Sequence, residues 1–202
     1  MTEELNKLYN QLYTNEKTKD TKTTIQLVEP DLNVIDTSEY TDRDDLAKAT
    51  RILADYAIAL QKDDRNAESI PFLEKAITRI ENNPELIKTD IVNETLYESL
   101  VFHRGLAKYA LKNYKEAKSD FKMLVEKDRT NAEYRTMHDQ MVKMTFRKYE
   151  WILVALIVIS AAASIYIGKK NLFAYRISYG VLIAVIIGFY EVGFLKKRQM
   201  IK

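Results

Sequence analysis

The sequence predicts an all-α protein in which helical-hairpin repeats are followed by a transmembrane helical hairpin. From residue 44 to residue 148, apolar residues recur at three- and four-residue spacings, which is typical of amphipathic helices. This stretch has one glycine and two prolines and no alternating strand pattern. Two long, nearly uncharged stretches follow within residues 149–198. The predicted organisation is an N-terminal arm (1–43), a helical repeat domain (44–148) and two transmembrane helices (149–198).

The N-terminal arm combines a predicted helix with a predicted extended segment. Leucines and tyrosines share one helical face in residues 2–13, where a short amphipathic helix is expected. The polar segment 15–24 follows. In residues 23–36 the apolar positions alternate only loosely, and Pro30 disfavours a helix interior. We expect an extended segment here, either a linker or an internal ligand lying in the groove of the repeats.

The central domain is predicted to consist of antiparallel helix pairs. Apolar residues line one face in 44–61 and again in 70–80. The linkers 62–66, 82–84 and 112–113 are too short to do more than reverse the chain. Each helix therefore lies against its neighbour in the sequence.

Four residues in segment 97–135 stand where a tetratricopeptide repeat has its small, aromatic and alanine positions: Gly105, Tyr114, Ala117 and Phe121. The segment resembles such a repeat, in which a small residue lets the two helices approach closely. A weaker copy lies 48 residues earlier, whereas the family period is about 34 residues. The excess around residues 81–94 indicates an extended helix or an extra turn. Residues 132–148 are expected to form a helix that caps the stack.

The resemblance implies a concave face, formed by the first helix of each pair, that binds a protein or peptide partner. The residues that it assigns to this face are Arg51, Ala54, Ile58, Ser99, Phe102, Leu106 and Tyr109. A mostly apolar face suits an amphipathic helix or an extended apolar segment. The alternative is that the N-terminal arm or the extra helix already covers it.

Two spans are predicted at about 150–168 and 172–195. The first contains 18 consecutive uncharged residues, about 27 Å of helix against a hydrocarbon core of ~30 Å. Lysine and arginine are more numerous at the outer ends of the spans than at the turn, which predicts an integral, multi-pass protein with cytoplasmic termini. A bacterial inner membrane is preferred to an organelle membrane. Small residues every four positions indicate packing within the hairpin or homo-oligomerisation: Gly180, Ala184 and Gly188.

Composition argues against several functional classes. The chain has no cysteine and two histidines, and it lacks a glycine-rich phosphate loop and a nucleophile elbow. No catalytic, cofactor or metal site is predicted, and the slightly acidic repeat domain disfavours nucleic-acid binding. The predicted function is a membrane-anchored, tetratricopeptide-like scaffold or adaptor on the cytoplasmic side of a membrane. The alternative is a structural or oligomeric subunit of a membrane complex whose transmembrane hairpin carries the function.

Overall fold

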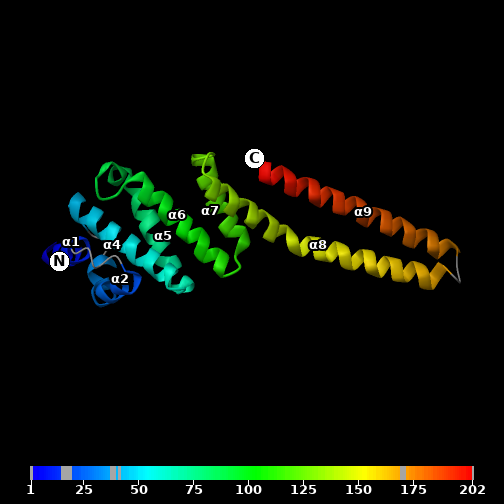
Figure 1. The fold of residues 1–202 in the computed structure, drawn as a ribbon, viewed down its shortest axis with the longest axis horizontal. Helices are drawn as coiled ribbons and strands as arrows, with labels where there is room; N and C mark the ends of the chain where they lie inside the picture. The colour runs from blue at the N-terminus through cyan, green and yellow to red at the C-terminus, as the bar shows by residue number, and fades with distance from the viewer. Residues whose placement is uncertain (1, 15–19, 37–39, 41, 169–171, 202) are drawn as a thin grey trace. The chain divides into compact units, whose positions relative to one another are not determined.

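Helices are the only regular secondary structure in the described residues, so the predicted all-α class is confirmed (Figure 1). The computed structural model describes residues 2–14, 20–36, 40, 42–168 and 172–201, some of them by their backbone alone. Two compact units are present, Met1–Tyr134 and Arg135–Lys202. The elements are α1 (Thr2–Thr14), α2 (Thr21–Val28), the 3-10 turn η2 (Glu29–Asp31), α3 (Leu32–Asp36), α4 (Arg43–Lys62), α5 (Asn66–Asn82), the 3-10 turn η3 (Pro84–Lys88), α6 (Glu94–Ala110), α7 (Tyr114–Lys127), α8 (Ala132–Gly168) and α9 (Leu172–Ile201).

The first unit is built on two helical hairpins, α4–α5 and α6–α7, as the short linkers predict. Both hairpins turn in the same way. The Arg65 amide donates to the Leu60 carbonyl at 2.9 Å, and 48 positions later the Asn113 amide donates to the Lys108 carbonyl at 2.9 Å. This five-residue return is the long hydrogen bond of a Schellman motif. The two hairpins therefore repeat with the 48-residue register of the sequence.

The residues between the two hairpins form a turn and a loop and do not lengthen either helix. α5 ends at Asn82, and α6 begins at Glu94. Between them lie η3 and a loop in which the Thr89 hydroxyl accepts a hydrogen bond from the Val92 amide at 3.0 Å. The Asn93 side chain then caps α6 by accepting from the Leu96 amide at 2.9 Å.

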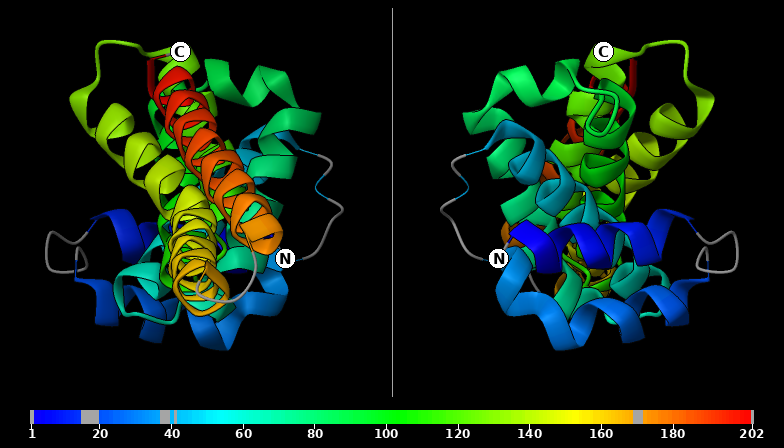
Figure 2. Two further views of the ribbon diagram at one scale, coloured as in Figure 1. Left: turned by 90° about the vertical axis from the view of Figure 1, so that its right-hand side faces the viewer. Right: turned by 90° about the vertical axis from the view of Figure 1, so that its left-hand side faces the viewer.

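The N-terminal arm forms a third, shorter helix pair, which corrects the predicted extended segment. Residues 21–36 fold as α2, η2 and α3 because Ile25, Val28 and Ile35 bury their side chains at helical spacing. Pro30 is accommodated in η2, where the first turn needs no amide donor. α1 and α2 lie side by side, and both pack against α4 (Figure 2).

This third pair takes a defined place in the stack. Shifted by the 48-residue register, positions 21–36 correspond to 69–84, which is the region of α5. Accordingly, α2 packs against α4 as α5 packs against α6, and α1 packs against α4 as α4 packs against α6. The arm closes one end of the stack instead of crossing the α4–α6 face.

The structure does not support the predicted transmembrane hairpin, whose residues belong to the second unit. Within the described part of the chain, no helix combines the length and the apolar composition that crossing a membrane requires. In α9 the described stretch carries Glu191 and Lys196. The integral, multi-pass localisation with cytoplasmic termini in a bacterial inner membrane is therefore wrong.

Helix α8 is nevertheless one continuous element of 37 residues. No proline or glycine occurs between Asn131 and Gly168, so nothing in the sequence interrupts its hydrogen-bond ladder. The Asn131 side chain starts the helix by accepting from the Glu133 amide at 3.0 Å.

Candidate functional sites

A groove of about 390 Å³ opens between α4 and α6, the first helices of the two hairpins. Positions 51, 55, 58 and 62 of α4 form one wall, and their spacing of three and four residues places them on one helical face. The other wall comes from α6 and its N-cap. The lining residues are Arg51, Asp55, Ile58, Lys62, Asn93, Thr95, Leu96, Ser99 and His103.

One end of the groove is held by a charged cluster that includes α1. The Asp55 carboxylate accepts from Arg51 Nε at 2.9 Å and from the Tyr13 hydroxyl at 2.6 Å. The Arg51 guanidinium also lies 5.9 Å from the centre of the Tyr13 ring. Burial and the neighbouring carboxylate raise the pKa of Tyr13 above its ordinary value. The cluster fixes Arg51 and Asp55 in place, so their charges offset one another.

The other end of the groove presents a neutral histidine beside a cation. His103 Nδ1 lies 2.8 Å from Gln61 Oε1, which accepts only, so Nδ1 carries the proton and Nε2 is left as an acceptor. Burial, together with the charge of Lys62, lowers the pKa of His103 to about 4. At neutral pH this end therefore offers an imidazole acceptor and an exposed ammonium group.

The residues predicted for the concave face divide into two groups. Arg51, Ile58 and Ser99 line the groove. The remaining four residues do not line the groove: Ala54, Phe102, Leu106 and Tyr109. Ala54 is fully buried, and the Tyr109 ring packs on Tyr114 with centroids 5.9 Å apart.

The Phe102 ring packs against other aromatic side chains. Its ring centroid lies 5.7 Å from that of Phe121 and 5.8 Å from that of Tyr134 at the start of α8. The accessible groove is consequently more polar than the face predicted from the sequence, because several of the predicted apolar residues do not line it and pack elsewhere.

The predicted packing residues of the second hairpin meet at its centre. Ala117 and Phe121 are fully buried, and the Phe121 ring lies directly over Gly105. Tyr114, at the start of α7, reaches Tyr109 of α6. These contacts join the two helices of one hairpin.

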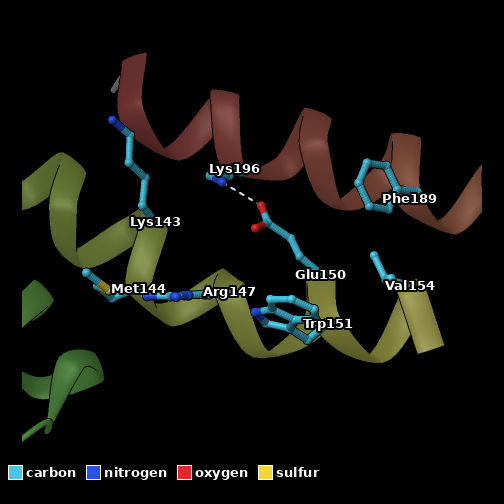
Figure 3. A pocket seen from close by; sticks show the side chains of 8 residues that line it. All are labelled: Lys143, Met144, Arg147, Glu150, Trp151, Val154, Phe189 and Lys196. Carbon is cyan, nitrogen blue, oxygen red and sulfur yellow. Dashed lines mark hydrogen bonds and ion pairs between the residues drawn. The ribbon is translucent and has the colours of Figure 1, made fainter.

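The second unit contains a cleft of about 430 Å³ between α8 and α9 (Figure 3). Figure 3 shows Glu150 of α8 reaching toward Lys196 of α9, and their Oε1 and Nζ atoms are 2.5 Å apart. Val154 and Phe189 lie beyond this ion pair on the facing helices (Figure 3). The lining is completed by Lys143, Met144, Arg147 and Trp151.

The small residues predicted to pack along α9 differ in their surroundings. A Cβ atom at Gly188 would lie 3.7 Å from Leu153 Cδ2, an ordinary contact with α8. A Cβ atom at Gly180 would meet no described atom within 4 Å, and Ala184 is exposed. Among the described contacts of these three positions, that of Gly188 is with α8.

Three carboxylates gather at the start of α4, those of Asp42, Asp44 and Asp45. Their ligand oxygens lie within 4.8 Å of one another. Acidic groups are favourable in the first turn of a helix, and Asp44 also pairs with Lys48. These interactions account for the cluster within the helix itself.

Searches for related proteins add no family assignment, since no family model, curated protein or solved structure matches the chain. The candidate sites therefore depend on their own geometry. Sequence reasoning does not assign Asp55 and Lys62 to the groove. Their positions four residues after Arg51 and Ile58 would have placed them on the same face of the helix.

Proposed function

We propose that the first unit is a scaffold or adaptor module that binds a peptide or protein partner in the groove between α4 and α6. The observation that carries this proposal is the groove itself, which lies between the first helices of successive hairpins. This is the face used for peptide binding by tetratricopeptide repeats, which segment 97–135 resembles. Its mixture of apolar, hydroxyl, amide and cationic groups suits a short peptide.

The lining chemistry favours an extended peptide over a wholly apolar helix. Ile58 and Leu96 offer limited apolar contact, while Ser99, the Asn93 amide and His103 offer polar partners to a peptide backbone. Lys62 adds one exposed cation, and described side chains form no ion pair with it. A partner segment with alternating apolar and polar side chains meets these requirements.

A photo-crosslinking amino acid at Ser99 tests the proposal in cells. We expect adducts with a separate protein, identified by mass spectrometry, and we expect Ile58→Glu to abolish them. The matched control is the same crosslinker at Met123, an exposed residue of α7 that does not line the groove. Adducts confined to this chain, or equal adducts from both positions, would contradict the proposal.

A further inference from the structure

The cleft of the second unit places positive charge and apolar surface on the same two helices. Lys143, Arg147, Trp151 and Val154 follow one another at spacings of three and four residues on one face of α8. Phe189 and Lys196 face them from α9 (Figure 3). Cations therefore lie toward one end of the cleft, and apolar side chains lie toward the other.

Of the three cations that line the cleft, one pairs with a carboxylate among the described side chains. Lys196 pairs with Glu150 at 2.5 Å. Among the described side chains, no carboxylate forms an ion pair with Lys143 or Arg147. Both are exposed, and guanidinium and ammonium groups each bind the oxygens of a phosphate group.

The apolar surface continues beyond the cleft and is left uncovered. Trp151 is 65% exposed, Val158 61%, Ile187 57% and Tyr190 77%. Single exposed apolar residues are common, but several large ones on each of two neighbouring helices indicate a binding surface. From Arg147 to Val158 the helix rises about 16 Å, a length suited to an apolar chain extending from a bound headgroup.

We propose that this cleft binds a phospholipid with an anionic headgroup, whose phosphate contacts Lys143 and Arg147 while its acyl chains lie along Val154, Val158 and Phe189. The charges favour an anion, and the adjoining apolar surface favours a ligand with a long apolar part. Trp151 lies at the boundary between the two, where an indole packs its ring on apolar groups and keeps its N–H near polar ones. This proposal is independent of the peptide groove in the first unit.

The chain carries its own reporter, because Trp151 is its single tryptophan. We would titrate the purified full-length protein with dihexanoyl phosphatidic acid, below its critical micelle concentration, and follow tryptophan fluorescence. We expect a saturable change, with affinity about tenfold higher than for dihexanoyl phosphatidylcholine, whose acyl chains are the same but whose headgroup has no net charge. Inorganic phosphate should bind at least about tenfold more weakly than phosphatidic acid.

Three variants locate the interaction. Arg147→Gln should weaken phosphatidic acid binding by about tenfold, while Lys197→Gln, which removes the same charge one residue outside the cleft, should change it by less than about twofold. Glu150→Gln should strengthen binding several-fold because it frees Lys196. A gain of affinity cannot arise from misfolding, so this variant keeps the test informative if Arg147→Gln is poorly folded.

Five results would overturn the proposal, four of them from the titrations above. These are the absence of a saturable change with phosphatidic acid, equal binding of phosphatidylcholine, equal binding of inorganic phosphate, and equal losses in Arg147→Gln and Lys197→Gln. A fluorescence change that follows protein concentration and not lipid would also overturn it, because it would mean that a second copy of the chain covers the apolar surface.

Discussion

The ring of Phe121 lies so close to Gly105 that a Cβ atom there would be 2.8 Å from Phe121 Cζ. Real side chains do not approach this closely, so α6 and α7 require a residue without a Cβ atom at this position. Phe121 is fully buried and packs edge-on against Phe102, which limits its movement. The glycine is a condition of the close helix pairing.

We expect Gly105→Ala to lower the free energy of unfolding by about 1–3 kcal/mol, because overpacking outweighs the ~1 kcal/mol gain in helix propensity. Urea denaturation followed by far-UV circular dichroism measures this change. The control is Gly193→Ala in α9, where no described atom lies within 4 Å of the new Cβ and only the propensity gain should remain. Unchanged stability in Gly105→Ala would show that Phe121 can move aside.

A buried ion pair joins the two helices of the second hairpin. Asp120 accepts from Arg104 at 2.7 Å and 3.2 Å, and Lys108 Nζ lies 3.2 Å from the same carboxylate. We expect Asp120→Ala to lower the free energy of unfolding by about 3–5 kcal/mol, because it leaves the buried Lys108 and the half-buried Arg104 without this partner. Urea denaturation measures the loss, and a cost below about 1 kcal/mol would indicate that water replaces the carboxylate.

The first hairpin suggests a matched replacement for this ion pair. Forty-eight residues earlier, Tyr56 and Phe72 occupy the corresponding positions, with ring centroids 5.2 Å apart. We expect the triple variant Arg104→Tyr, Lys108→Leu and Asp120→Phe to regain most of the stability lost in Asp120→Ala, because packed apolar residues replace a buried ion pair at little cost. The same denaturation series tests this. A triple variant less stable than Asp120→Ala would contradict this prediction and would show that the two hairpins pack differently around these positions.

Each hairpin turn contains a non-glycine residue with positive φ, namely Asp64 at 61° and Lys112 at 64°. A left-handed conformation costs an L-residue about 1–2 kcal/mol. We therefore expect Lys112→Gly to raise the free energy of unfolding by about 1 kcal/mol. The control is Lys122→Gly, within α7, which should instead lower the free energy of unfolding by about 1 kcal/mol. Equal effects of the two substitutions on the thermal midpoint would contradict this prediction.

The pKa of His103 predicts a pH dependence of stability. Burial lowers this pKa from 6.5 to about 4, so the unfolded chain binds a proton at a higher pH than the folded chain does. The resulting contribution to stability is complete above pH 6.5 and is lost as the pH falls to about 4. His103→Gln, which retains a polar partner for Gln61, should reduce the slope of stability against pH in this range. Parallel curves for the two proteins would show that His103 does not titrate in this way.

The helices of the repeats could be predicted because their signals are local. Periodic apolar residues identify α4 to α7, and the short linkers fix their antiparallel pairing. Pro30 does not exclude helices from its segment, because it lies in a turn between two short helices and interrupts neither of them.

The candidate sites depended on contacts between distant residues, and these could be predicted only in part. The α4–α6 face follows from the resemblance, but Phe102 turns toward Tyr134, 32 residues away, and this pairing leaves no mark in the local pattern. Gln61 and His103 likewise meet across 42 residues. In the second unit, the sequence alone does not show that Lys196 and Phe189 of α9 face Lys143 and Arg147 of α8.

The position of α4 within the first unit has a consequence for motion. α4 packs against α1, α2, α3, α5 and α6, so every local opening of that unit leaves it in contact with several neighbours. The outer helices α1 and α7 have fewer such neighbours, and each can detach while the rest of the stack remains folded. Backbone amides between Ile52 and Leu60 should consequently exchange with solvent deuterium more slowly than any others in this unit, and their exchange rate reports the complete unfolding of the stack.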